Sequence, residues 1–244
     1  MFQKKLEYEC DGVLFESSIY NRESHERRPI VMIAHAWAGK DPFSEMIAQK
    51  VAELGYVGCA MDVYGKGVRG TSTEEKLALM NPLVENRPLL RKRLSAAYEN
   101  VAELPYSMAS HCVVLGYCFG GLCALEMHRC ISQLKGVVSV HGLLGVPKDG
   151  SLFQPQEDET RSRVLALHGA DDPMVSSQDM LDFTREMNEN RVDWQLYQYG
   201  RVKHAFTNPD ADDHVLGTVY NKLADQRSWR AITNFLEECF SRSE

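Results

Sequence analysis

A cysteine stands between two glycines in the segment from Val113 to Gly121, which reads Val-Val-Leu-Gly-Tyr-Cys-Phe-Gly-Gly. Its apolar start predicts a buried strand, and the G-x-C-x-G pattern predicts a sharp turn from that strand into a helix. Small residues two positions either side of the cysteine are needed because neighbouring backbone passes close to such a turn. The turn holds its central side chain at the carboxyl edge of a sheet, so Cys118 is predicted to be a nucleophile.

Cysteine suits acyl chemistry at this position because its thiolate is strongly nucleophilic and a following helix N-terminus favours the thiolate. The chain has seven cysteines, an odd number, and none has C-x-x-C spacing. Neither a disulfide framework nor a zinc ribbon is therefore indicated. We interpret most of the other six as small buried apolar residues.

Short apolar segments alternate with amphipathic segments along the chain. An opening hairpin is expected at 4–9 and 13–20, joined by Asp11-Gly12. Further strands are expected at 30–34, 56–61, 112–115, 136–140, 164–168 and 193–199, and helices at 43–54, 71–104 with a break near Pro82, 177–188 and 216–240, with a polar loop at 148–161. This alternation predicts one α/β domain over residues 1–244, with a mostly parallel central sheet and helices on both faces.

Composition excludes several classes of protein. A chain of 244 residues with 44% hydrophobic residues can bury one sizeable core. The net charge of -7 gives no basic surface for nucleic acid, and the basic stretch from Arg87 to Arg93 is predicted to be a solvated helix face. No apolar run has the length of a membrane span, and the start lacks the apolar centre of a signal peptide. We expect a cytoplasmic protein without a membrane partner.

A thiol nucleophile needs a base, and the base needs an orienting acid. In sheets of this kind the chain order is nucleophile, acid, histidine. Asp171 and Asp172 follow the strand at 164–168, and His204 lies in a loop before the terminal helix. Loops at the carboxyl ends of parallel strands share one edge of the sheet, so these side chains are predicted to converge on Cys118.

Several motifs spread over nearly the whole chain carry a family resemblance. They are Gly116-Tyr117-Cys118-Phe119-Gly120-Gly121, His35-Ala36-Trp37-Ala38-Gly39, Leu54-Gly55-Tyr56, Asp62-Val63-Tyr64-Gly65, the H-G-x-x-D-P-x-V run from His168, and His204-Ala205-Phe206-Thr207-Asn208-Pro209. With them the chain resembles the dienelactone hydrolase family of the α/β-hydrolase fold. The resemblance implies that fold, assigns the triad acid to Asp172 with Asp171 as its neighbour, and implies an oxyanion hole formed by the backbone N–H groups of Trp37 and Phe119.

The sequence departs from the family pattern at three positions. The resemblance implies a glutamate in the loop after the third strand, where this chain has Ala36. It also implies two arginines that grip a substrate carboxylate, where this chain has Lys66 and Asn208, with Arg69 nearby. A lysine lacks the bidentate fork of arginine. Lys66 and Arg69 are therefore the predicted substrate-binding residues, and the expected substrate is a small ester or lactone other than dienelactone.

The predicted reaction is hydrolysis through a Cys118, His204 and Asp172 triad and a thioester, with neither a metal nor an organic cofactor. Ala36 also fits a catalytically weakened ligand-binding or regulatory protein with the same fold. A redox sensor in which Cys118 pairs with Cys123 or Cys112 is a further alternative. The histidines lack the i, i+4 spacing of a ligand pair, which disfavours a metal enzyme. The sequence does not indicate an oligomeric state.

Overall fold

The computed structural model describes residues 1–22, 26–147 and 162–241, so the predicted loop at 148–161 lies outside the described residues. The strands are β1 (Phe2–Cys10), β2 (Val13–Asn21), β3 (Arg28–Ala34), β4 (Val57–Ala60), β5 (Ser107–Tyr117), β6 (Leu134–Val140), β7 (Arg163–Gly169), β8 (Trp194–Tyr199), β9 (Asp212–Asp213) and β10 (Thr218–Val219). The helices are α1 (Pro42–Glu53), α2 (Thr73–Glu85), α3 (Arg87–Ala102), α4 (Phe119–Cys130), α5 (Ser177–Glu189) and α6 (Lys222–Phe240).

In the described part of the chain, eight strands form one sheet in the order β1-β2-β4-β3-β5-β6-β7-β8. β2 runs antiparallel to both of its neighbours, β1 and β4, whereas β4, β3, β5, β6, β7 and β8 run parallel to one another. Asp11 and Gly12 both have positive φ, at 52° and 74°, which suits the tight turn predicted between the first two strands. The parallel strands bring their carboxyl ends to one edge of the sheet.

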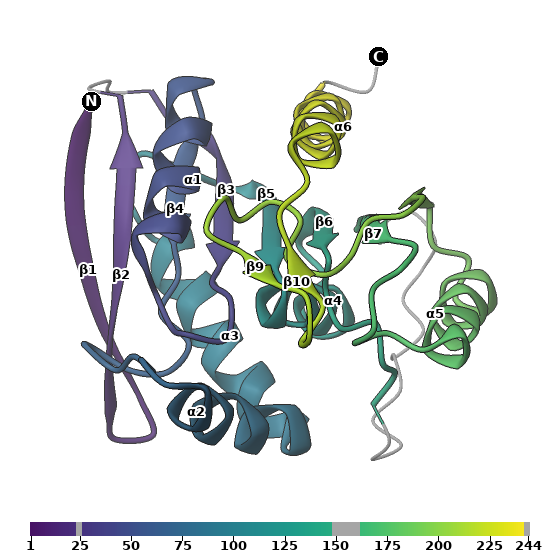
Figure 1. Cartoon of the computed structure of the whole chain (residues 1–244). Coiled ribbons are helices and arrows are strands. Elements are labelled where there is room, and N and C mark those ends of the chain that lie inside the picture. The colour runs from purple at the N-terminus through teal and green to yellow at the C-terminus, as the bar shows by residue number, and fades with distance from the viewer. Residues whose placement is uncertain (23–25, 148–161, 242–244) are drawn as a thin grey trace.

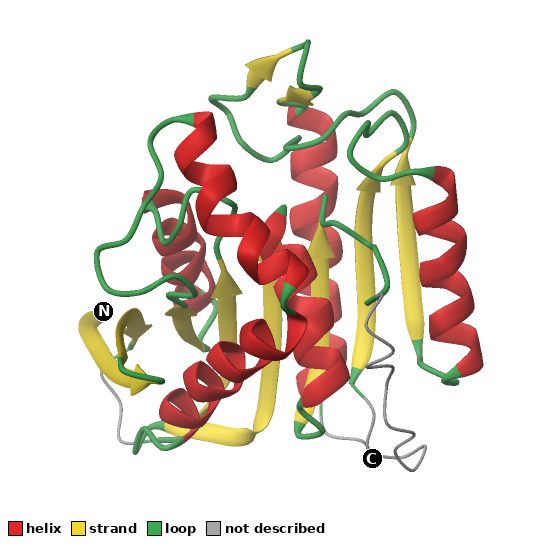
Figure 2. Ribbon diagram, turned by 90° about the horizontal axis from the view of Figure 1, so that it is seen from below, coloured by secondary structure: helices red, strands yellow, loops and turns green. Residues whose placement is uncertain are grey.

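Helices cover both faces of this sheet because its strands are apolar on both sides. Along β3, Ile30 and Met32 belong to the core under α3 and α4, whereas Val31 and Ile33 belong to the core under α1 and α6. Figures 1 and 2 show the helices lying against the strands in this arrangement. The predicted α/β-hydrolase fold, with a mostly parallel sheet between helices, is confirmed.

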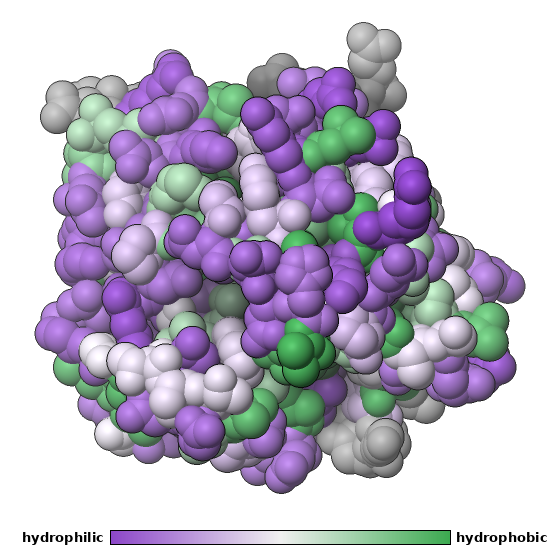
Figure 3. Space-filling view, in the orientation of Figure 1, coloured by the Kyte–Doolittle hydropathy of each residue, from purple (hydrophilic) through white to green (hydrophobic). Residues whose placement is uncertain are grey.

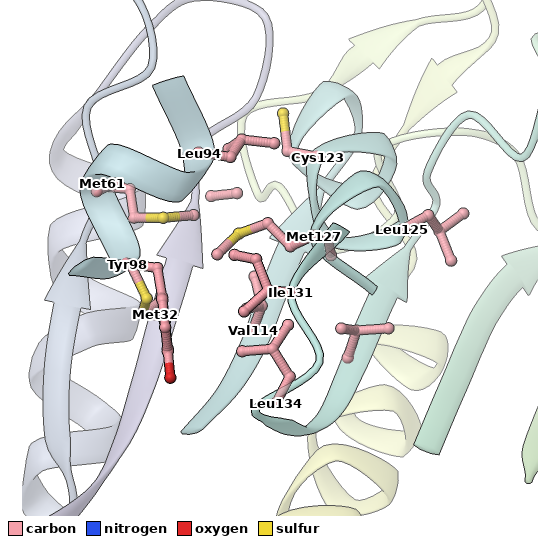
Figure 4. Close-up of a cluster of buried hydrophobic side chains, with 14 of the residues drawn as sticks. Met32, Met61, Leu94, Tyr98, Val114, Cys123, Leu125, Met127, Ile131 and Leu134 are labelled. Carbon is pink, nitrogen blue, oxygen red and sulfur yellow. The ribbon is translucent and has the colours of Figure 1, made fainter. Parts of the chain in front are cut away.

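The core beneath α3 and α4 supports the helix that follows Cys118. In Figure 4, Cys123 of α4 lies beside Leu94 of α3, and Met127 of α4 extends to the side where Tyr98 of α3 lies. The surface is polar by contrast, and Figure 3 shows a mainly hydrophilic face with small separate hydrophobic patches. Within the described residues, every helix is too short or too polar to cross a lipid bilayer.

Two helix boundaries differ from the sequence prediction. The break between α2 and α3 lies at Asn86, and Pro82 is inside α2. Asn86 starts α3 because its Oδ1 accepts a hydrogen bond of 3.0 Å from the N–H of Leu89. The terminal helix begins at Lys222, because Asn221 caps it through the N–H of Ala224. The preceding residues instead contribute to the small β9–β10 hairpin, which the sequence did not reveal.

A buried ion-pair network corrects the prediction of a solvated basic face on α3. Glu126 of α4 is fully buried, and its carboxylate accepts from Arg87 at 2.9 Å and Arg91 at 2.6 Å. Arg129 donates to Glu126 at 2.7 Å and binds Glu186 of α5 through two nitrogens. Removing one member would leave an unpaired buried charge, so the network fixes α4 against α3 and α5.

Candidate active site

Cys118 lies at the turn between β5 and α4, as predicted, and has a positive φ of 56°. A Cβ atom on Gly116 would lie 1.8 Å from the carbonyl oxygen of Gly120. A Cβ atom on Gly120 would lie 2.1 Å from the carbonyl oxygen of Ala34. Both glycines are therefore required by backbone contact, which is the physical reason for the G-x-C-x-G pattern.

Asp172 and His204 are joined in the buried interior at the carboxyl edge of the sheet. Oδ2 of Asp172 lies 2.7 Å from Nδ1 of His204, and its Oδ1 accepts 2.9 Å from the N–H of Met174. Both side chains are at most 1% exposed. Asp171 is exposed. Of the two aspartates, the structure brings Asp172 to the histidine.

The electrostatics of His204 favour a proton on its ring. Burial alone lowers the pKa of this histidine, but Cys118 nearby and the hydrogen bond with Asp172 outweigh burial and raise the pKa to about 10. Its Nε2 is buried and, among the described residues, meets no partner at full hydrogen-bond geometry. Because Asp172 occupies Nδ1, Nε2 is the ring atom available to the thiol proton of Cys118.

Two further buried histidines surround this pair, and sequence analysis assigned a role to neither. The ring centroid of His141 lies 5.1 Å from that of His204, and its Nε2 lies 2.9 Å from Oγ1 of Thr207. Nδ1 of His168 lies 4.0 Å from Oδ2 of Asp172. Burial lowers the pKa of both, which keeps them neutral beside a protonated His204. The sequence feature that could have identified them is a histidine at the carboxyl end of each of two neighbouring strands, β6 and β7.

The two predicted oxyanion donors follow neighbouring strands. Phe119 is the first residue of α4, so its N–H is one of the groups that a helix leaves without an intrahelical partner. Trp37 lies in the turn after β3, where the N–H of Gly39 donates to the carbonyl of Ala36 at 3.2 Å. Because β3 pairs with β5, the structure places Trp37 and Phe119 beside the same edge as Cys118.

Of the two predicted substrate-binding residues, Lys66 is paired away from the site, whereas Arg69 packs beside Gly39 in the turn that carries Trp37. The ammonium group of Lys66 pairs with Glu7 and Glu16 of the β1–β2 hairpin, which β4 and β3 separate from β5. Arg69 is exposed and lines a pocket of about 320 Å³ with Glu16 and Lys40. The structure therefore does not bring Lys66 to Cys118, because two acidic side chains of the hairpin hold it at the edge of the sheet.

Asn208, at the second arginine position of the family pattern, hydrogen-bonds its own local backbone. Its side chain accepts a hydrogen bond of 3.1 Å from the N–H of Asp210, and the residue is exposed. This is an Asx turn, in which the side-chain oxygen serves the local backbone.

The two cysteines considered as redox partners of Cys118 fit a structural role better than a redox role. Cys112 and Cys123 are fully buried, and burial raises the pKa of both thiols. Figure 4 shows Cys123 in the apolar core beside Leu94. Thiols that stay protonated in an apolar core are inert. Among the described residues, no three His, Cys, Asp or Glu side chains gather in a group suited to a metal ion.

Comparisons with known proteins show the family of this chain. The model of the Dienelactone hydrolase family matches residues 15–240. The chain belongs to this family. As a dienelactone hydrolase family member it is an enzyme that hydrolyses esters or lactones.

Three similar proteins illustrate the relationship. A protein of Aquifex aeolicus (strain VF5) named "Putative carboxymethylenebutenolidase" is 26% identical over 95% of this chain and 96% of its own length. A solved structure named m3DLH is 30% identical, with a TM-score of 0.88 over 98% of this chain and 99% of its own. The solved structure of a dienelactone hydrolase-like promiscuous phosphotriesterase from metagenomic libraries is 27% identical, with a TM-score of 0.87 over the same shares.

Proposed function

We propose that this enzyme hydrolyses a small carboxylic ester or lactone through Cys118, His204 and Asp172, with a thioester acyl-enzyme. The observation that carries the proposal is the buried hydrogen bond between Asp172 and His204, whose free Nε2 lies near a cysteine held at a strand-to-helix turn. A nucleophile, a base and an orienting acid on three loops of one sheet edge are the parts that acyl transfer needs.

In the first half of the reaction, Nε2 of His204 takes the proton from Sγ of Cys118. The thiolate attacks the substrate carbonyl carbon, and the N–H groups of Trp37 and Phe119 stabilise the oxyanion. As the tetrahedral intermediate collapses, the C–O bond to the alcohol breaks, and the imidazolium gives its proton to the departing oxygen. A thioester on Cys118 and a free alcohol result.

In the second half, His204 removes a proton from water, and the hydroxide attacks the thioester carbonyl. Collapse breaks the C–S bond, the acid leaves, and the proton returns to the sulfur. Asp172 keeps its hydrogen bond to Nδ1 and stabilises the imidazolium that forms twice in the cycle.

The substrate we propose carries no obligatory carboxylate. Lys66 is held by Glu7 and Glu16, and Asn208 is engaged in its own turn. Neither supplies the bidentate contact that selects a carboxylate. Recognition then depends on the shape of the acyl and alcohol groups.

The test is a panel of short-chain aryl esters and lactones, with a phosphotriester included because a solved relative is a phosphotriesterase. Activity should be lost after treatment with a thiol alkylator and in Cys118→Ala, and kept in Cys130→Ala, which removes an exposed thiol of the same helix. Intact-mass measurement after brief exposure to an aryl ester should show one acyl group in wild type and none in Cys118→Ala. Turnover or acylation that survives Cys118→Ala would contradict the proposed nucleophile.

A further inference from the structure

Tyr64 contacts both residues whose backbone is proposed to form the oxyanion hole. Its hydroxyl donates a hydrogen bond of 3.0 Å to the carbonyl oxygen of Trp37. Its ring stacks on that of Phe119, with centroids 5.8 Å apart and planes inclined by 24°. Tyr64 is 5% exposed, and burial raises the pKa of its hydroxyl, so the hydroxyl remains a donor. One side chain from the loop after β4 thus joins the ends of β3 and β5.

A second contact fixes the other peptide beside Trp37. Nδ1 of His35 donates to the carbonyl oxygen of Ala36 at 2.7 Å, while Nε2 accepts from the N–H of Val63 at 3.2 Å. The carbonyl of Ala36 and the N–H of Trp37 belong to one planar peptide unit, so holding the carbonyl sets the direction of the N–H. The Tyr64 hydroxyl holds the carbonyl of the next peptide. Both peptide planes that flank Trp37 are therefore fixed.

The segment that carries Tyr64 is itself anchored from three sides. Oδ1 of Asp62 accepts from the N–H groups of Tyr64 at 3.1 Å and Gly65 at 3.0 Å. Arg93 of α3 donates to the carbonyl of Val63 at 3.0 Å. The ring of His35 packs against that of Tyr64 with centroids 4.8 Å apart. Because its backbone is held at these points, the Tyr64 side chain can hold Trp37 and Phe119 in fixed positions.

We propose that Tyr64 is a positioning residue that sets the geometry of the oxyanion hole, holding Trp37 by its hydroxyl and Phe119 by its ring. The proposal rests on the proposed function of those two backbone N–H groups. An oxyanion hole works because its donors are already placed where charge develops, and a shift of about 1 Å is enough to weaken catalysis severely. Tyr64 contributes by preventing the Trp37 turn from moving relative to Phe119.

The matched variants are Tyr64→Phe and Tyr98→Phe. Each removes one hydroxyl from a buried tyrosine that donates to a backbone carbonyl, and the Tyr98 bond of 3.3 Å goes to Ala109, away from the Trp37 turn. In Tyr64→Phe, kcat should fall about tenfold with KM nearly unchanged, a smaller loss than removing an oxyanion donor itself. Binding of a trifluoromethyl ketone, whose tetrahedral adduct places an oxyanion in the hole, should weaken by the same factor.

Two readouts separate positioning from a general loss of structure. The rate at which iodoacetamide alkylates Cys118 should stay within about twofold of wild type, because alkylation develops no oxyanion. Hydrogen exchange of the amides at 36–39 should accelerate in Tyr64→Phe and not in Tyr98→Phe. Thermal unfolding of both variants reports whether each is folded.

The outcomes are distinct. A fall in kcat and inhibitor affinity confined to Tyr64→Phe supports the positioning role. Values within twofold of wild type, or equal losses in both variants, overturn it. If wild type hydrolyses no member of the panel, the proposed function fails instead. Hydrogen exchange in Tyr64→Phe then tests the role of Tyr64 by itself. Unchanged exchange of the amides at 36–39 overturns the anchoring of Trp37 by Tyr64, and faster exchange supports it.

Discussion

Oδ2 of Asp172 lies 2.7 Å from Nδ1 of His204, and the side chains of both residues are almost completely buried. A hydrogen bond to a carboxylate at Nδ1 leaves Nε2 as the only ring nitrogen that can exchange a proton with the nucleophile. Asp171, the adjacent aspartate, is exposed. Substitution of Asp172 should therefore affect turnover far more than substitution of Asp171.

Asp172→Asn should lower kcat by about 10³- to 10⁴-fold, because an amide at this position favours the wrong imidazole tautomer and cannot stabilise the imidazolium. Asp171→Asn is the matched control and should stay within about threefold of wild type, as exposed substitutions away from the reacting groups usually do. Steady-state kinetics on one aryl ester measures both. A larger loss in Asp171→Asn would show that the acid has been assigned to the wrong neighbour.

The pH dependence follows from the raised pKa of His204. Its pKa is about 10 in the folded protein against a usual 6.5, so His204 keeps its proton until the pH passes about 10. The rate should fall above this pH, because a neutral ring cannot protonate the departing alcohol. The corresponding contribution to folding stability is fully present below pH 6.5 and is lost as the pH rises through about 10.

A pH–rate profile of kcat/KM for wild type and Asp172→Asn tests this assignment. Removing the carboxylate removes two of the interactions that raise the pKa, so the alkaline limb of the variant should move to lower pH. Urea unfolding of wild type at several pH values should show a parallel loss of stability on the alkaline side. An alkaline limb that stays in place in Asp172→Asn would contradict the coupling between the two residues.

Cys118→Ala should lower esterase turnover by at least about a thousandfold while the protein remains folded, because the triad acts as a unit. Cys118→Ser should retain a small residual rate, since its oxygen fits the turn but a hydroxyl depends on a stronger base than a thiol does. Circular dichroism establishes the fold of both variants. Turnover by Cys118→Ala within tenfold of wild type would exclude Cys118 as the nucleophile.

Local patterns in the sequence predicted the features of the fold that depend on local chemistry. Apolar runs predicted β3 and β7 because strands buried on both faces must be apolar throughout. The glycines around Cys118 predicted the turn because a Cβ at either site meets backbone. His204 and an aspartate of the Asp171-Asp172 pair were predicted from their places after strands, the family resemblance assigned the acid to Asp172, and the structure joins Asp172 directly to His204.

Features that depend on contacts between distant segments were missed. Lys66 matches an arginine position in the family pattern, yet its direction is set by Glu7 and Glu16, more than forty residues earlier in the chain. Arg87 belongs to a basic stretch that looks solvated until Glu126 of α4 is packed against it. Tyr64 belongs to the Asp62-Val63-Tyr64-Gly65 motif, but only the fold shows that it contacts Trp37. Contacts between segments this far apart in the chain cannot be predicted from local sequence patterns.

Gly120→Ala should destabilise the protein by about 3 kcal/mol, at the upper end for overpacking, because the added Cβ would meet the backbone oxygen of Ala34 at 2.1 Å. Backbone at the end of β3 cannot move aside as a flexible side chain can. Gly200→Ala is the control, since a Cβ there meets nothing within 4 Å. Urea unfolding measures both variants, and equal stabilities would show that the turn accommodates a side chain.

Lys66→Ala should leave kcat/KM unchanged within about twofold for a carboxylated ester and for its neutral methyl ester alike, as expected for a substitution remote from the reacting groups. The ammonium group is 43% exposed and is already paired with two carboxylates of the β1–β2 hairpin. A substrate carboxylate at Cys118 would have to draw it away from both partners and across the strands β4 and β3. If KM rises for the carboxylated ester alone, Lys66 does reach the substrate, and the hairpin pairing seen here must exchange for it during binding.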